Sequence, residues 1–321
     1  MKREEILRNF LEILRKKIPR KSKLTTTLMN LLFIEKGAVN RRLRGEVPFS
    51  FYEVVSICEK LNIPLNSLIV PDPEMSERFV LSFIEYTDTN ERDFKFWDDY
   101  LSFVHAAKND PLSEIEEASN TLPVTLFAGF DWLTKYYIFK YQYRLHEKKD
   151  RKVFGDLEIP DRWLRIFRSY YDESKYFAKT TYIIDSMIFQ NLVSDIRFFS
   201  DICLIGADDI AQIKHDLTTL LDYIEKIAFH GYFEETKNPV FFYISDVSLE
   251  ADYTCAFVND TYSSTVRTFL LNYVQSNDRA SYMTIKDWIH SLKESSTLIT
   301  QTGAMYRTDF FEKQRRIVAE L

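Results

Sequence analysis

The sequence predicts a mainly α-helical protein, in which a small N-terminal domain of five short helices precedes a larger helical domain. Three observations lead to this fold class. Only 7 glycines and 9 prolines interrupt the 321 residues, long stretches are rich in residues that favour helices, and apolar residues recur at spacings of three and four. The hydrophobic share of 45% is sufficient for the cores of two or three compact domains.

The composition excludes several classes of protein. The three cysteines, Cys58, Cys203 and Cys255, lie far apart and form no C-x-x-C pair, so neither a disulfide framework nor a thiolate metal site is expected. The first residues alternate acidic and basic side chains, unlike a secretory signal. No uncharged run approaches the roughly 20 residues that a membrane span needs. We therefore expect a cytoplasmic protein that does not enter a membrane.

The charge is distributed unevenly along the chain. Residues 1–70 hold 14 lysines and arginines and 7 aspartates and glutamates, a charge of +7. The remainder holds 28 of the 42 basic and 41 of the 48 acidic residues, a charge of −13. Attraction to phosphates supplies most non-specific affinity for DNA, so a basic head on an acidic body suits a DNA-binding protein. Small helical domains can also be basic without binding DNA, so charge alone does not decide between the two.

The first two helices are predicted from their apolar spacing. One face of a helix that ends near Pro19 carries Ile6, Leu7, Phe10, Leu11, Leu14 and Ile18. A second helix begins near Ser22 or Lys23, and its apolar residues are Leu24, Leu28, Leu31 and Leu32. The two helices are expected to pack through these faces.

The segment from Glu35 to Gly45 carries the clearest functional pattern. It is short and ends at a glycine suited to the left-handed backbone that follows many helices. With Val39 and Leu43 turned inward, the outward side chains are Lys36, Asn40, Arg41 and Arg44. Asparagine can form two hydrogen bonds with adenine and arginine two with guanine, while lysine and arginine also bind phosphates. We predict that these four residues contact DNA; the alternative is a solvated basic face.

The fourth helix has a clear start signal. Ser50 and Glu53 have the spacing of a capping box, and Phe49 before the cap can pack on Val54. A short fifth helix is expected after Pro64, where the apolar residues are Leu65, Leu68 and Ile69.

This arrangement resembles the phage-repressor-like helix-turn-helix family of transcriptional regulators. The segment from Val39 to Gly45 matches the end of that family's recognition helix and the glycine after it, and residues 53–69 match its closing pair of helices. Where the family has a glycine-containing turn between its second and third helices, this chain has Leu32-Phe33-Ile34. The resemblance, which covers about a fifth of the chain, implies a helix-turn-helix DNA-binding domain over residues 1–70.

Residues 71–74, around Pro71-Asp72-Pro73, are predicted to link this domain to a helical dimerisation or effector domain at 75–321. A long aromatic helix is expected from Pro123 to about Lys148, and another helix from Ile210 to Phe229. The segments 240–244 and 253–258 are aromatic and β-branched, so a small sheet is expected near residues 240–258. The clusters at 136–139 and 170–171 are interpreted as core packing rather than as a ligand cage.

No motif for catalysis is apparent. The sequence lacks the two common phosphate-binding glycine loops, and its five histidines lack the spacing of a metal site. We expect no enzyme, no metal site and no cofactor. The sequence predicts a sequence-specific regulator of transcription that binds double-stranded DNA as a homodimer and responds to a small-molecule or protein effector. The alternative is a protein-interaction scaffold built from helical hairpins.

Overall fold

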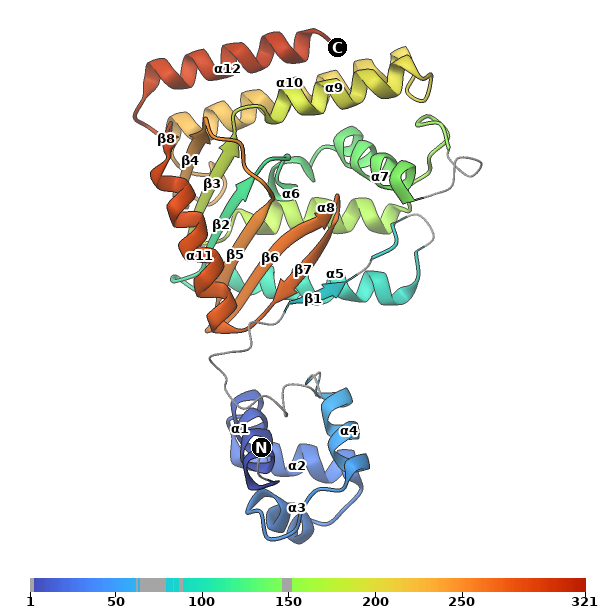
Figure 1. The fold of residues 1–321 in the computed structure, drawn as a ribbon, viewed down its shortest axis with the longest axis vertical. Helices are drawn as coiled ribbons and strands as arrows, with labels where there is room; N and C mark the ends of the chain where they lie inside the picture. Colours follow the sequence, from blue (N-terminus) through green and yellow to red (C-terminus); the bar gives the residue numbers. More distant parts are fainter. Residues whose placement is uncertain (1–2, 62, 64–78, 83, 87–88, 146–151) are drawn as a thin grey trace. The chain divides into compact units, whose positions relative to one another are not determined.

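The structure is a computed structural model that describes residues 3–61, 63, 79–82, 84–86, 89–145 and 152–321. The chain divides into two units, Met1–Ser76 and Glu77–Leu321, which are shown in Figure 1. The predicted linker at 71–74 and the predicted fifth helix around Leu65 lie outside the described residues. Among the described residues, no helix has the length and apolar character needed to span a bilayer.

Four helices make up the described part of the first unit: α1 (Arg3–Lys17), α2 (Lys21–Leu32), α3 (Lys36–Leu43) and α4 (Phe51–Lys60). Their apolar faces meet in one cluster, as the spacing predicted; its buried residues include Phe10, Leu14, Leu24, Leu28, Val39, Leu43 and Ile57. The predicted capping box at the start of α4 is confirmed. The Glu53 amide donates to Ser50 Oγ at 3.2 Å, and the Ser50 amide donates to Glu53 Oε2 at 2.7 Å.

The turn between α2 and α3 has an unusual conformation. Phe33 has φ +53°, in the left-handed region, and its side chain is 93% exposed. Its neighbours Leu32 and Ile34 both pack against the apolar cluster. Leu32 and Ile34 thus anchor the turn, and the residue between them has a backbone conformation that is unfavourable for a residue that carries a Cβ atom.

The larger unit contradicts the predicted fold class. It contains an eight-stranded mixed sheet with helices on both faces, not a helical domain with a small sheet. The strand order is β1-β7-β6-β5-β2-β3-β4-β8. The strands are β1 (Val80–Ser82), β2 (Glu114–Ser119), β3 (Lys179–Asp185), β4 (Val240–Ser245), β5 (Tyr253–Val258), β6 (Thr261–Phe269), β7 (Asn272–Ser276) and β8 (Ser296–Leu298).

Three parallel strands form the middle of this sheet. β2 pairs with β3 and β3 with β4, all in parallel. The crossover from β2 to β3 contains α6 (Val124–Phe127), α7 (Asp131–Leu145) and α8 (Asp161–Ser174), and the crossover from β3 to β4 contains α9 (Ile188–Asp201) and α10 (Ala207–His230). Such connections are long because parallel neighbours cannot be joined by a hairpin. The predicted strands at 240–244 and 253–258 do form, but β2 and β3 lie between them.

The other strands are antiparallel additions at the two edges. β5, β6 and β7 form a meander beside β2, and β1 pairs with β7. At the opposite edge β8 pairs with β4. The remaining helices are α5 (Glu91–His105), followed by a short 3₁₀ turn, α11 (Arg279–Glu294) and α12 (Ala304–Ala319).

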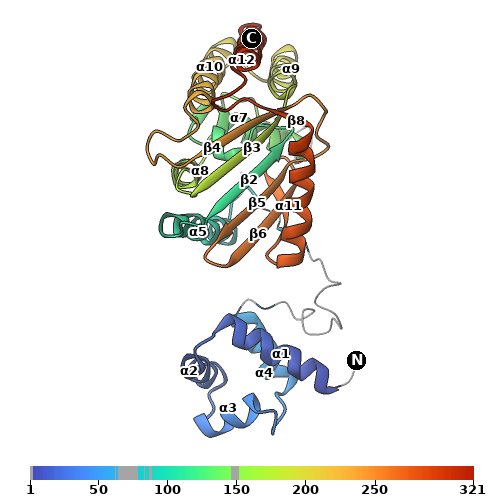
Figure 2. The same cartoon turned by 90° about the vertical axis from the view of Figure 1, so that its left-hand side faces the viewer.

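The two faces of the sheet are covered by different helices (Figures 1 and 2). On one face, Ala118, Ile183 and Cys255 pack against Tyr282 and Ile289 of α11. Alternate strand residues point to the other face and join the main core, which includes residues of α5, α6, α7, α8, α9 and α10. This second face carries the site described below.

The long helix predicted from Pro123 to about Lys148 is wrong in part. Gly129 separates α6 from α7, and a Cβ atom on Gly129 would lie 2.7 Å from the Tyr171 ring. The close approach of this ring therefore requires glycine at the break. The helix predicted from Ile210 to Phe229 is confirmed as α10, which ends at Gly231 with φ +79°.

Replacing Phe33 should test the conformational cost of the α2–α3 turn. We expect Phe33→Gly to raise the free energy of unfolding of the first unit by about 1 kcal/mol or less, because relief of the left-handed strain is partly offset by the greater freedom of glycine in the unfolded chain. Urea unfolding of the full chain, followed by the circular dichroism of the helices, measures this change. Phe51→Gly at another exposed position should instead destabilise, because it weakens α4. A loss of stability in Phe33→Gly would contradict the interpretation.

Candidate functional site

The helix α3 presents a polar face above a buried one. Val39 is fully buried and Leu43 nearly so. The predicted DNA-contacting residues are all accessible: Lys36, Arg41 and Arg44 are exposed and Asn40 is half-buried. Lys36 is the first residue of α3, while Arg44 is its C-cap and precedes Gly45, which has φ +77°. The predicted set thus spans the whole length of the helix.

The four basic residues of this segment have two different roles. Arg42 is only 19% exposed in its side chain and forms an ion pair with Glu53 of α4, with Nη2–Oε1 at 2.9 Å and Nε–Oε2 at 3.1 Å. Because Glu53 also caps α4, Arg42 joins α3 to the start of the next helix. Arg42 therefore stabilises the fold, whereas its neighbours remain available for contacts.

Glu46 holds both outward arginines of the segment. Arg44 contacts it through Nε at 2.6 Å and Nη2 at 3.1 Å, and Arg41 Nε lies 3.8 Å from Glu46 Oε2. The hydrogen bond from Arg44 lowers the pKa of Glu46 below its ordinary value. All three side chains are about half exposed or more, so these pairs contribute little to stability and can exchange for other partners.

Asn40 and Lys36 make no side-chain hydrogen bond within the part of the chain that the structure describes. Both are therefore free to act as donors to an external partner. The sequence pattern predicts that these two residues and the two arginines contact DNA. It did not predict the ion pairs with Glu46 or the different role of Arg42.

Comparison with protein families assigns the first unit. Residues 4–82 match the BetR domain, a helix-turn-helix DNA-binding domain associated with regulators. The N-terminal unit is similar to a helix-turn-helix domain of this kind. At this coarse level the match supports a DNA-binding regulatory role, and it does not point to the phage-repressor family in particular. No curated protein and no solved structure is significantly similar to the chain.

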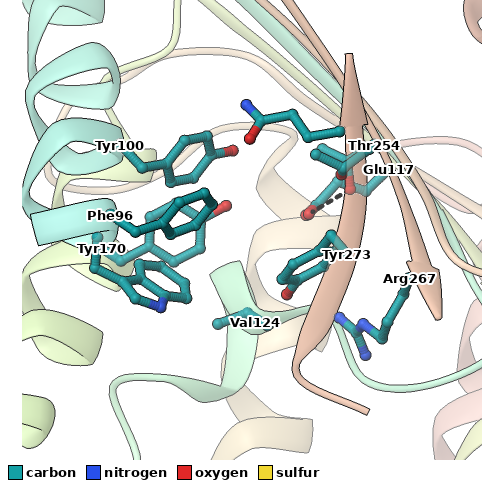
Figure 3. Close-up of a pocket in the computed structure, with 11 residues that line it drawn as sticks. Phe96, Tyr100, Glu117, Val124, Tyr170, Thr254, Arg267 and Tyr273 are labelled. Atoms are coloured by element: carbon teal, nitrogen blue, oxygen red, sulfur yellow. Dashed lines mark hydrogen bonds between the residues drawn. The ribbon is translucent and has the colours of Figure 1, made fainter. Parts of the chain in front are cut away.

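Beyond the BetR domain, the larger unit contains a cavity of about 30 Å³ between helices and one face of the sheet (Figure 3). This volume suits about two water molecules or a small chemical group. The helical side of the cavity is apolar and aromatic, and it is formed by Phe96, Trp97, Tyr100, Val124 and Tyr170. The sheet side is mostly polar, and it is formed by Glu117, Thr254, Thr265, Arg267, Tyr273 and Gln275.

The register of the sheet assembles this polar side. Glu117 of β2 lies opposite Thr254 of β5, Thr254 opposite Thr265 of β6, and Thr265 opposite Gln275 of β7. These four residues form one row across four adjacent strands. Residues two apart on a strand share a face, so Arg267 and its partner Tyr273 lie beside this row.

Glu117 is buried, with 5% of its surface exposed. Its carboxylate accepts hydrogen bonds from the hydroxyls of Thr125 and Thr254. No lysine or arginine forms an ion pair with it among the described residues. Burial raises the pKa of Glu117 to about 7.

Arg267 is the second buried charge beside the cavity, and its side chain is 9% exposed. It pairs with Asp252 at 2.9 Å between Nη1 and Oδ2 and donates to the hydroxyl of Thr121. Its Nε is buried and has no hydrogen-bond partner in the described structure. The charges of Arg267 and Asp252 therefore cancel, while the buried Nε–H donor remains unused.

The sequence interpretation of the aromatic clusters is correct for one and incomplete for the other. Tyr136, Tyr137 and Phe139 are buried in the main core, whereas Tyr170 lines the cavity. The sequence analysis missed Glu117, which lies in a strand whose last five residues are buried in the structure. Within the described ranges, no group of three potential ligands is placed to hold a metal ion.

Glu117 should make the stability of the chain depend on pH. The folded protein holds the proton of Glu117 with a pKa of about 7, against an ordinary value of 4.5, so it binds this proton more tightly than the unfolded chain does. This contribution to stability is fully present below pH 4.5 and is lost as the pH rises through 7. Between pH 4.5 and pH 8 the wild-type protein should lose at most about 3 kcal/mol of its free energy of unfolding through this group. Glu117→Gln should abolish this loss.

Urea unfolding of wild type and Glu117→Gln across this pH range measures the difference. The other charged groups that face Glu117 are Arg267 and Asp252. The tyrosines around it stay protonated because burial raises the pKa of each; they are Tyr100, Tyr170, Tyr182 and Tyr273. The exposed Glu158→Gln is the matched control. If the free energy of unfolding had the same pH dependence in wild type and Glu117→Gln, folding would not change the pKa of Glu117.

Proposed function

We propose that this protein is a sequence-specific regulator of transcription, which reads DNA bases with α3 and uses its α/β unit to sense an effector or to dimerise. The observation that carries the proposal is the exposed face of α3 in a unit that matches the BetR domain. Asn40 and Arg41 have the chemistry to pair with bases, and Lys36 and Arg44 to hold phosphates. The charge of +7 in residues 1–70 supports the same function.

The alternative of a scaffold built from helical hairpins loses its structural basis. Its repeat would require stacked helix pairs after the first domain, and the larger unit is instead organised around one eight-stranded sheet. We therefore do not pursue it.

Substitution of the exposed α3 residues tests the proposal. The variant in which Lys36, Asn40, Arg41 and Arg44 are all alanine should lose specific binding to a duplex selected from genomic DNA. Asn40→Ala or Arg41→Ala alone should relax base preference by about 1–3 kcal/mol. Fluorescence anisotropy with specific and scrambled duplexes measures both effects. Unchanged binding by the folded quadruple variant would overturn the assignment.

Glu46 provides a second test, with an effect in the opposite direction. Because Glu46 pairs with Arg44 and Arg41, Glu46→Gln should free Arg44 for a phosphate and Arg41 for a base. We expect tighter binding to any duplex, with a salt dependence that is steeper by about one phosphate contact. Glu12→Gln changes the net charge of the unit equally at an exposed position on α1 and serves as the control. Equal gains in both variants would show that only net charge matters.

We further propose that the regulator is a homodimer, since one small helix-turn-helix domain contacts too few base pairs for genomic specificity. Paired half-sites about one helical turn apart are the expected footprint. Light scattering of the full chain with and without its operator measures the assembly. A monomer that protects a single half-site would contradict the dimer while leaving the DNA-binding role intact.

A further inference from the structure

The cavity of the larger unit contains one buried carboxyl group, that of Glu117, without a counter-ion among the described residues. Arg267 is neutralised by Asp252 at 2.9 Å, so Glu117 is the excess charge of this cluster. A buried carboxylate without a partner is costly, and it is relieved either by a proton or by a cation. The chain itself supplies hydroxyl donors to Glu117 but no cation among the described residues.

Aromatic rings line the side of the cavity opposite this carboxylate, as Figure 3 shows. The ring centroids of Tyr100 and Tyr170 are 5.6 Å apart, and those of Trp97 and Tyr170 are 5.5 Å apart. In the described residues the rings of Tyr100 and Tyr170 have no cation–ring contact of their own, whereas Tyr273 has one with Arg267. Ring faces attract cations, most strongly where water is excluded.

We propose that this cavity binds a small organic cation, whose ammonium group lies between the Glu117 carboxylate and the rings of Tyr100 and Tyr170. The ligand would bring the charge of the cluster to zero. An anion would be repelled by Glu117, and a zwitterion would leave the excess charge unchanged. The volume of about 30 Å³ limits the enclosed part of the ligand to a few heavy atoms.

The unused donor of Arg267 refines the chemistry of the ligand. Its Nε is buried beside the cavity without an acceptor in the described structure. Because Asp252 already balances the guanidinium charge, this N–H suits a neutral oxygen rather than a carboxylate. A small amine that also carries a hydroxyl group offers a cation to Glu117 and an acceptor oxygen to Arg267.

Calorimetric titration of the full chain tests this assignment, with ethanolammonium and methylammonium chloride as probes and sodium acetate, glycine and sodium chloride as comparisons. We expect ethanolammonium to bind most tightly, methylammonium more weakly, and the comparison compounds not at all. Glu117→Gln should weaken ethanolammonium at least tenfold and Tyr100→Leu several-fold, while Glu158→Gln should change nothing.

The wild-type protein offers a readout that needs no variant. Near pH 6 the amine must displace the proton of Glu117, so binding should release up to one proton and its heat should depend on the ionisation enthalpy of the buffer. The affinity should rise with pH between 5 and 8. Absence of amine binding, tighter binding of acetate or glycine, or binding without proton release would overturn the proposal.

The role of the cation as an effector rests on the proposed function, whereas its binding does not. DNA affinity of the full chain should therefore be measured with and without ethanolammonium. Amine binding with unchanged DNA affinity would overturn the effector role alone. Intact amine binding in a chain that binds no DNA would overturn the proposed function alone.

Discussion

The position of β2 at the centre of the sheet is the constraint on which the larger unit depends. This strand carries Glu114, Glu116 and Glu117, yet it pairs with β3 on one side and β5 on the other. Each carboxylate needs a partner from elsewhere in the chain: Lys286 and Tyr282 contact Glu114, His290 contacts Glu116, and two threonines contact Glu117. Helix α11 can cover its face of the sheet because it brings the first three of these partners.

The carboxylates on the two faces of β2 are balanced in different ways. Towards α11, the carboxylates of Glu114 and Glu116 meet basic side chains. Towards α5 and α8, Glu117 meets hydroxyls and aromatic rings, and its excess charge is balanced by protonation within the protein. A buried group that can be neutralised by a proton has two states whose stabilities differ with pH.

In the helix-turn-helix domain, ion pairs separate stability from recognition. Arg42 is committed to Glu53 and to the start of α4, while Arg41 and Arg44 share the exposed Glu46. Exchange of Glu46 for phosphates costs little, because exposed ion pairs are weak. The Glu46 carboxylate also lowers the local positive charge that Arg41 and Arg44 present to solvent.

The sequence by itself determined the helices of residues 3–61, because their apolar spacing and the capping box at Ser50 act within a few residues. It also located two strands, at 240–244 and 253–258, from their β-branched and aromatic residues. It could not predict the sheet, since glutamates disfavour strands and the partners of β2 come from distant segments. The sequence also did not predict the different roles of Arg41, Arg42 and Arg44, because these roles depend on ion pairs with Glu46 and Glu53. Only the tertiary structure assembled the cavity, since Glu117 and Thr254 are 137 residues apart and meet solely through the register of β2 and β5.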